Sequence, residues 1–165
     1  MILDEEVLAV ILAITVVASV FGIAMVLRPN VVEPFIAIGL LNEHCKIGAY
    51  PKYVVPNQTI TLCIFIDNYL GKPVYWMVTY KIGDSESIPT NTSPSPRKPL
   101  KEWFGVLDNG ENTTFLVKVP IYISKDLEGE KRIALIFELW IYNTTSGRWV
   151  YSGRWTHLYV EVVKR

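Results

Sequence analysis

The feature that most constrains this chain is an apolar run at residues 7–27, which reads VLAVILAITVVASVFGIAMVL. The run contains no charged residue and no proline. As an α-helix with a rise of about 1.5 Å per residue it is roughly 31 Å long, which matches the hydrocarbon core of a bilayer. A core helix of a soluble protein rarely stays apolar on every side over this length. The sequence therefore predicts a transmembrane helix over residues 7–28, after a short tail at residues 1–6.

A cleaved signal peptide is the main alternative for this segment. Signal peptides begin with basic residues and have a shorter apolar stretch, whereas here Asp4, Glu5 and Glu6 precede the run. We therefore expect a retained single-pass anchor in the lipid bilayer. Small residues within the run, such as Gly22, would permit close packing against helices of other integral membrane subunits, although small residues are common in membrane helices.

Two patterns disagree about the side of the membrane on which the rest of the chain lies. Arg28 follows the run directly, and basic residues favour the cytoplasmic side of a membrane helix. Asn-X-Ser/Thr sequons favour the opposite side, because they accept N-linked glycans in secreted and surface domains. A single sequon is equally well a threonine-rich turn, but the four in this chain exceed chance; they begin at Asn57, Asn91, Asn112 and Asn143. The sequence therefore predicts a cell-membrane protein whose C-terminal domain is extracellular and carries N-linked glycans.

The chain has two cysteines, Cys45 and Cys63, and both lie in this C-terminal domain. An even, minimal count in an extracellular domain is typical of one disulfide. Closing a loop of about 17 residues would stabilise the domain by roughly 3 kcal/mol in the loop-entropy model. A pair of buried thiols in a reducing compartment is the alternative.

After a juxtamembrane link at residues 29–34, the hydrophobic pattern changes to the period of two that is typical of β-strands. Apolar and β-branched runs bounded by turn residues predict strands at 60–67, 74–82, 114–119, 132–142 and 158–163. Strands with one apolar face each bury it by pairing as two sheets, so residues 35–165 are predicted to form an all-β, immunoglobulin-like β-sandwich. The polar, proline-rich segment at 83–100 is expected to be a long exposed loop.

The tetrapeptide Ser-Gly-Arg-Trp occurs twice in the stretch SGRWVYSGRW, residues 146–155. In one unbroken strand Trp149 and Trp155 would share a face, and the arginines would share the other with the aliphatic residues that follow. A bulge at Ser152-Gly153 that resets the register would resolve this conflict, because glycine tolerates the required backbone. We expect the bulge to leave one tryptophan less buried than the other. The resulting apolar contact surface is predicted to consist of Trp149, Tyr151, Trp155 and Tyr159.

Little in the sequence supports catalysis, a cofactor or a metal site. The formal net charge is zero, so the chain lacks the basic face that nucleic-acid binding requires. A copper-like site would combine two histidines, a cysteine and a methionine, yet neither cysteine nor methionine lies near His157 in the sequence. The acidic residues around Glu128 alternate with lysines, which is typical of a solvated loop and not of paired catalytic carboxylates. We expect no enzymatic activity, no cofactor and no metal.

Carbohydrate binding is a further alternative, because sugar-binding sandwiches present flat aromatic rings and this chain has five tryptophans. Most tryptophans of small sandwiches belong at least partly to the core. Two exposed and coplanar rings would favour the carbohydrate alternative.

Several turn and core motifs of residues 35–163 resemble a known family. They include Phe35-Ile-Ala-Ile-Gly-Leu-Leu, Gly48-Ala-Tyr-Pro-Lys, Leu107-Asp-Asn-Gly-Glu and Ile136-Phe-Glu-Leu-Trp. This part resembles the C-terminal extracytoplasmic domain of archaeal membrane proteins that share the domain of unknown function 1616. The chain departs from longer members in having one membrane helix in place of a helix bundle. The resemblance implies an archaeal cell-surface setting, and it transfers no catalytic residue.

These features predict a non-catalytic accessory or structural subunit of a larger archaeal membrane or cell-envelope complex. The helix would pack among other membrane helices, and the sandwich would cap the extracellular side. The alternative is a cell-surface module that binds carbohydrate or protein through exposed tryptophan and tyrosine. In either case the short link holds the sandwich near the bilayer, so its partners lie in or on the membrane.

Overall fold

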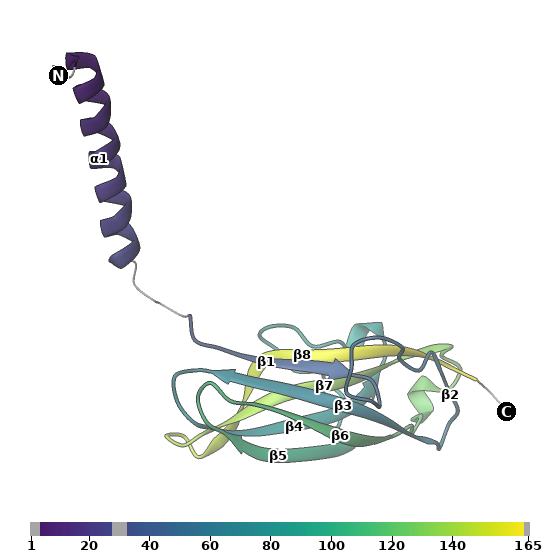
Figure 1. Cartoon of the computed structure of the whole chain (residues 1–165). Helices are drawn as coiled ribbons and strands as arrows, with labels where there is room; N and C mark the ends of the chain where they lie inside the picture. Colours follow the sequence, from purple (N-terminus) through teal and green to yellow (C-terminus); the bar gives the residue numbers. More distant parts are fainter. Residues whose placement is uncertain (1–3, 28–32, 164–165) are drawn as a thin grey trace. The chain divides into compact units, whose positions relative to one another are not determined.

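The computed structural model describes residues 4–27 and 33–163, which belong to two compact units divided between Glu33 and Pro34 (Figure 1). The first unit contains helix α1, Glu5–Val26, and the second contains β-strands and two short 3-10 helices. Arg28, residues 1–3 of the predicted tail and residues 29–32 of the predicted link lie outside the described residues.

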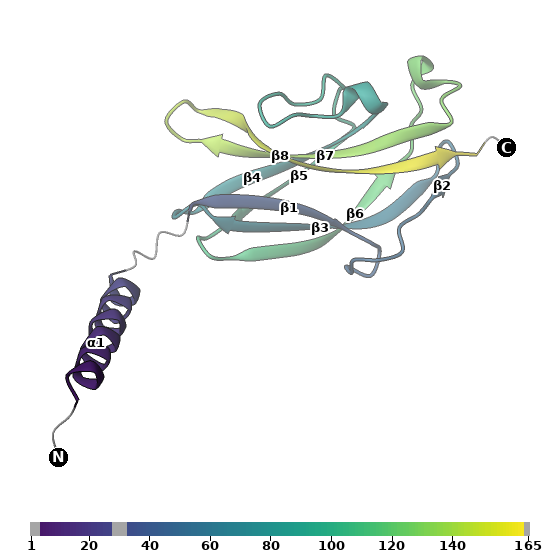
Figure 2. The same cartoon turned by 90° about the horizontal axis from the view of Figure 1, so that it is seen from above.

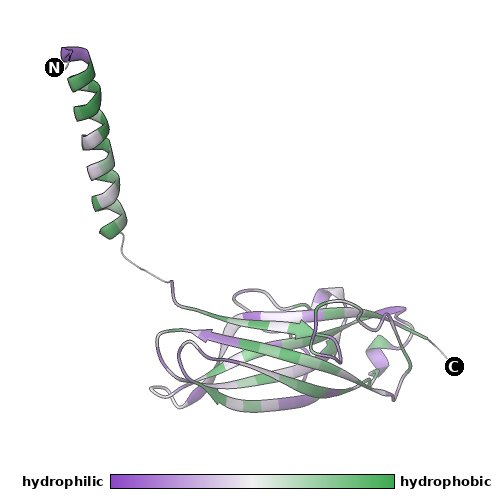
Figure 3. Cartoon of the chain, viewed as in Figure 1, coloured by the Kyte–Doolittle hydropathy of each residue, from purple (hydrophilic) through white to green (hydrophobic). Residues whose placement is uncertain are grey.

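Helix α1 forms where the apolar run predicts a helix, with Asp4 at its N-cap and Leu27 at its C-cap. None of its side chains is buried, and beyond the first turn the helix is predominantly apolar, with a few weakly polar residues in its middle (Figure 3). The Thr15 hydroxyl donates to the Ile11 carbonyl at 2.8 Å, and the Ser19 hydroxyl donates to the Thr15 carbonyl at 2.7 Å. These polar groups are therefore satisfied inside the helix and need no water. By length and composition the helix suits a membrane anchor or a signal sequence.

The second unit is built from two sheets that lie face to face (Figure 2). The strand orders are β1-β3-β6 and β2-β8-β7-β4-β5, and every pair is antiparallel except β2 with β8. The strands are β1 Phe35–Leu41, β2 Tyr53–Val54, β3 Thr59–Tyr69, β4 Val74–Gly83, β5 Lys101–Leu107, β6 Asn112–Pro120, β7 Arg132–Asn143 and β8 Arg148–Val162. The 3-10 helices are η1 Ser85–Ser87 and η2 Lys125–Leu127.

The inner faces of both sheets share one apolar core. Alternate residues of the long strands enter it, including Ile64 and Ile66 of β3, Val78 and Tyr80 of β4, and Leu135 and Phe137 of β7. Burial of these side chains from both sheets is the main force that holds the layers together. The prediction of two sheets is confirmed, although β1, β2 and β5 were not among the predicted strands.

The predicted disulfide is present. Cys45 and Cys63 are bonded, with their Cα atoms 5.2 Å apart. The bond ties the loop after β1 to the middle of β3, since Cys63 pairs with Leu41 at the end of β1.

The bulge predicted in β8 forms at Ser152-Gly153, but it does not reset the register. Trp140 pairs with Tyr151 and Leu139 pairs with Arg154, so two extra residues lie between consecutive pairs. An insertion of two residues preserves the alternation of faces. Trp149 and Trp155 therefore share the outer face, where both are half-buried, and the expected difference in their burial is not seen.

The segment at 83–100 was expected to be an exposed loop, and this expectation is wrong in part. The segment folds back over the outer face of the five-stranded sheet, where Ser87, Pro89 and Ser95 become buried. The physical reason is that charged side chains of β4 and β7 point outward here, and the backbone of the segment supplies the hydrogen bonds they need.

Candidate functional site

The largest group of aromatic side chains in mutual contact in the described sandwich lies on the outer face of the five-stranded sheet, and it is partly exposed. We call it the entry-end cluster; it consists of Tyr75 of β4, Phe104 of β5, Tyr142 of β7 and Trp149 of β8. The Trp149 ring lies 5.0 Å from Tyr75, 5.4 Å from Tyr142 and 5.7 Å from Phe104, measured between centroids. The rings are tilted by 45° to 70°, a geometry that aromatic pairs favour.

Strand register brings the cluster together. Tyr75 alternates with the inward-facing Trp76, and Tyr142 pairs directly with Trp149 across the β7–β8 hairpin. Tyr75 pairs with Val106 of β5, and Met77 pairs with Phe104. Phe104 therefore lies diagonally across from Tyr75, two residues along β5 from the residue directly opposite. Each strand therefore contributes one outward ring at the same end of the sheet.

The cluster is partly open to solvent, with Tyr142 and Trp149 half-buried and the other two rings exposed. Tyr75 is 44% exposed, Phe104 is 49% exposed, and the adjoining Val106 is 67% exposed. A contiguous apolar surface of this kind on a folded domain is typical of a contact site, whereas isolated exposed apolar residues need no explanation.

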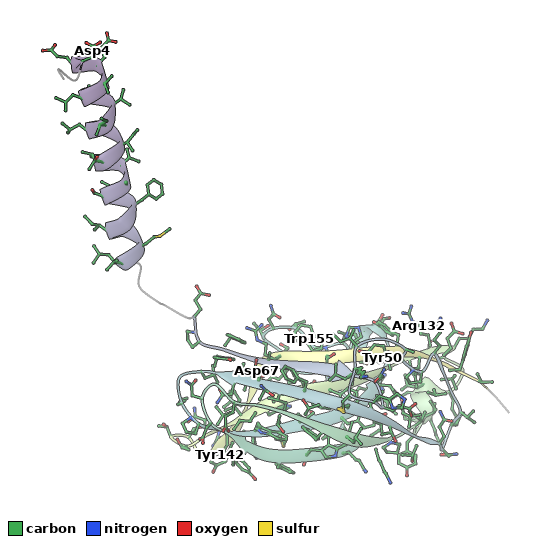
Figure 4. The ribbon with its side chains drawn as sticks, viewed as in Figure 1. Asp4, Tyr50, Asp67, Arg132, Tyr142 and Trp155 are labelled. Atoms are coloured by element: carbon green, nitrogen blue, oxygen red, sulfur yellow. A yellow bond between two sulfur atoms is a disulfide. The ribbon has the colours of Figure 1, made fainter. Side chains whose placement is uncertain are left out.

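The cluster lies at the end of the sandwich where the chain enters it. Phe35, the first residue of β1, stacks on Tyr69 with centroids 5.0 Å apart. A hollow of about 530 Å³ is lined by Pro34 together with Tyr75, Tyr142 and Val150, among others. Figure 4 labels Tyr142 at this end of the domain. The entry point of the chain and the exposed aromatic rings therefore belong to one end of the fold.

The four residues of the predicted contact surface share the outer face but do not form one surface. Trp149 belongs to the entry-end cluster. Tyr151 packs on Trp140 and donates from its hydroxyl to the Thr90 carbonyl at 3.0 Å, and burial, with the Glu138 charge second, raises its pKa to about 12. Trp155, labelled in Figure 4, lines a separate hollow of about 310 Å³ with Arg154 and the first residues of β1.

Tyr159, the fourth predicted residue, lies further along β8. The Arg132 guanidinium lies 4.1 Å from its ring centroid, and His157 contacts the ring edge-on at 4.9 Å. Burial lowers the pKa of His157, and the positive charge of Arg132 adds to this effect. Among the described residues, no group of three or more His, Cys, Asp or Glu side chains is arranged to hold a metal ion.

A buried ion pair that the sequence did not predict lies under the 83–100 segment. Lys81 Nζ is 2.9 Å from Glu138 Oε2, and the two side chains are 6% and 0% exposed. Lys81 also donates to the Ser95 carbonyl at 2.8 Å, and Glu138 accepts from the Ser95 amide at 2.5 Å. Thr79 and Trp140 donate to the same Glu138 carboxylate. The charges are enclosed and hydrogen-bonded to each other and to Ser95, so they fix the segment and are not open to a substrate.

Arg97 links the beginning of the 83–100 segment to its end and to η2. Its guanidinium donates to Asp84 at 2.9 Å, to Ser87 Oγ at 2.9 Å, and to Asp126 within η2. A hydrogen bond from Ser124, then that of Arg97, lowers the pKa of Asp126 to about 2. The hydrogen bond from Ser87 is the largest cause that lowers the pKa of Asp84. The Lys81–Glu138 pair holds the segment on the sheet, and Arg97 joins parts of the segment to each other and to η2.

Gly153 is expected to be essential for the close contact between β8 and this segment. Its φ is +71°, and a Cβ there would collide with the Asn91 carbonyl oxygen. Gly153→Ala should destabilise the sandwich by about 2–3 kcal/mol through backbone strain and displacement of the segment. Gly147→Ala is the matched control, because Gly147 has φ +63° but a Cβ there would meet only the Tyr142 hydroxyl at 3.8 Å, an ordinary contact. Urea unfolding of both variants checks this; equal losses would contradict a tight contact at Asn91.

The four sequon asparagines all have exposed side chains in the structure; they are Asn57, Asn91, Asn112 and Asn143. Asn143 accepts hydrogen bonds at Oδ1 from the amides of Thr145 and Ser146 in the β7–β8 turn. Exposure is what glycan attachment requires, and occupancy of the sites stays a prediction.

Comparisons with known proteins add remote structural similarities. No family model matches the chain, and no curated protein matches it. The CARDB domain of a Pyrococcus furiosus protein is 13% identical with a TM-score of 0.47, over 79% of this chain and 95% of that one. A β-glucosidase from Listeria innocua is 12% identical with a TM-score of 0.47, over 79% of this chain but only 16% of the enzyme. The resemblance to domain of unknown function 1616 therefore stays a prediction.

Proposed function

We propose that the protein is a non-catalytic, single-pass, membrane-anchored accessory subunit of a larger archaeal membrane or cell-envelope complex. The observation that carries this proposal is the apolar surface of α1, none of whose residues is buried. Such a helix is stable only where lipid or other membrane helices cover it. The helix is the anchor, and the sandwich caps the extracellular side.

Two features support the extracellular orientation. The Cys45–Cys63 disulfide persists in oxidising compartments and is rare in the cytosol. The exposed sequon asparagines are all positioned to carry glycans without disturbing the core. The positive-inside bias of Arg28 is a single charge and is outweighed by these features.

The topology supports an immunoglobulin-like classification of the sandwich. The sheet β8-β7-β4 opposite β1-β3-β6 corresponds to the G-F-C and A-B-E arrangement of immunoglobulin-like domains. Domains of this class are common contact modules at cell surfaces, which agrees with a subunit role. The motifs shared with domain of unknown function 1616 support the archaeal setting.

A surface module that binds carbohydrate or protein is the second candidate, and the entry-end cluster is the observation that favours it. Its rings are mutually tilted and present no flat two-ring platform for a sugar. Saturable signals on a glycan array that Trp149→Ala abolishes would favour the carbohydrate form of this candidate.

Gentle detergent extraction of the tagged full chain from its native membranes tests the subunit proposal. We expect partners to co-purify in fixed stoichiometry. A matched control replaces residues 7–27 by a polyleucine helix, which keeps the chain in the membrane but removes specific helix contacts such as those at Gly22. Loss of the partners in the control assigns the contact to the helix. A wild-type chain that elutes as a clean monomer would contradict the proposal.

A further inference from the structure

We propose that the entry-end cluster is a second membrane contact, in which the sandwich itself rests on the lipid headgroup region through Tyr75, Phe104 and Trp149. This inference rests on the proposed anchoring by α1 and deepens it. It assigns an occupant to an exposed surface that would otherwise be unexplained.

The first argument is the length of chain between the helix and the sandwich. The helix ends at Val26 with Leu27 as its C-cap, and the described residues resume at Glu33, directly before the sandwich unit. Six residue steps of at most about 3.5 Å span no more than roughly 20 Å. The end of the sandwich that holds Pro34 is therefore confined to the vicinity of the bilayer surface.

The second argument is that the aromatic rings lie at this same end. Pro34 lines one hollow together with Tyr75 and Tyr142, and the exposed Phe35–Tyr69 stack adjoins the entry point. Other strongly exposed apolar side chains of the sandwich are spread over separate elements, with Ile47 on a loop, Tyr53 in β2 and Leu116 in β6. The only cluster built from four strands in the described part is thus the one that the short link brings to the membrane.

The third argument is the chemistry of the residues. Tyrosine and tryptophan are enriched at membrane–water interfaces, because their rings are apolar and their polar atoms stay hydrated. Phe104 and Val106 add fully apolar surface that is 49% and 67% exposed. Charged residues of both signs lie at this end, since the Asn68 amide donates to the carbonyls of both Lys72 and Asp108. The contact therefore depends on the aromatic rings and does not require anionic lipid.

The sequence offers a clean spectroscopic test, because all five tryptophans follow residue 34 and none lies in the helix. The full chain is reconstituted in phosphatidylcholine vesicles, either unlabelled or brominated on the acyl chains, and isolated by flotation. Bromine quenches only tryptophans that approach the lipid. We expect lower emission in brominated vesicles than in unlabelled ones.

Single substitutions identify which tryptophan the bromine quenches. Trp149→Phe should abolish most of the quenching, whereas Trp103→Phe, which alters a half-buried ring packed on the core, should leave it unchanged. Phe104→Glu keeps every tryptophan and should reduce the quenching, because a charge at this exposed position opposes entry into the interface.

The outcomes separate this inference from the anchoring proposal. A chain that fails to float with vesicles contradicts the anchor itself. A chain that floats but shows equal emission in both vesicles overturns the lipid contact and leaves the anchor intact. If Trp149 is then also shielded from acrylamide in the aqueous phase, a second copy of the chain covers the cluster and the lipid assignment is wrong.

Discussion

Glu138→Ala is expected to destabilise the sandwich by about 3–5 kcal/mol, the usual cost of leaving one partner of a buried ion pair alone. The variant would leave the Lys81 ammonium buried without its anionic partner, since the Lys81 side chain is 6% exposed. It would also remove the acceptor of the Ser95 amide. The 83–100 segment would then lose its main attachment to the sheet. Urea unfolding followed by tryptophan fluorescence measures the loss.

Two controls make this prediction specific. Glu102→Ala removes an exposed carboxylate from the same face and should change stability by less than about 0.5 kcal/mol. The double variant Lys81→Met/Glu138→Leu removes both charges and should recover much of the stability, because apolar replacements of a buried pair are often neutral. A loss below about 1 kcal/mol for Glu138→Ala would show that the pair is not enclosed as the structure has it.

Removal of the disulfide is expected to cost about 3 kcal/mol, since the bond closes a loop whose ends are 18 residues apart. The mechanism is the larger conformational freedom of the unfolded chain, so the folded strands should keep their pairing. Cys45→Ser/Cys63→Ser tests this against the wild type with and without reductant. Reduced wild type and the double variant should unfold at the same urea concentration. An unchanged midpoint in both would contradict a stabilising disulfide.

The sequence predicts the strands of the core because their apolar residues alternate clearly. Strand β5 is not predicted, because its sequence does not alternate between apolar and polar residues. It is an edge strand in which Trp103 faces inward, Phe104 faces outward, and Gly105 follows. Gly105 is required there because the Trp76 ring occupies the space of a Cβ. The residues of this edge strand are thus selected by packing against the neighbouring strand, and their own β-propensity gives only a weak prediction of a strand.

The surface features could not be predicted for a different reason. Tyr75, Phe104, Tyr142 and Trp149 come from four strands, and only the register of those strands brings the rings together. Lys81 and Glu138 occupy outward positions that normally face water, so the sequence gives no sign that a segment will cover them. The glycine of the bulge at Gly153 makes its position predictable from the sequence. The number of extra residues in the bulge decides which face of the sheet the later residues of β8 occupy, and that number depends on the partner strand.

The central claim is that α1 crosses a membrane and leaves the sandwich outside, and thiol labelling tests it most directly. Both native cysteines are in the disulfide, so an introduced cysteine is the single reactive thiol. Glu128→Cys lies on an exposed turn of the sandwich, and Asp4→Cys lies before the helix. In intact cells a membrane-impermeant maleimide should label Glu128→Cys, and it should label Asp4→Cys only after lysis. Labelling in the reverse order, or recovery of the chain in the soluble fraction, would contradict the claim.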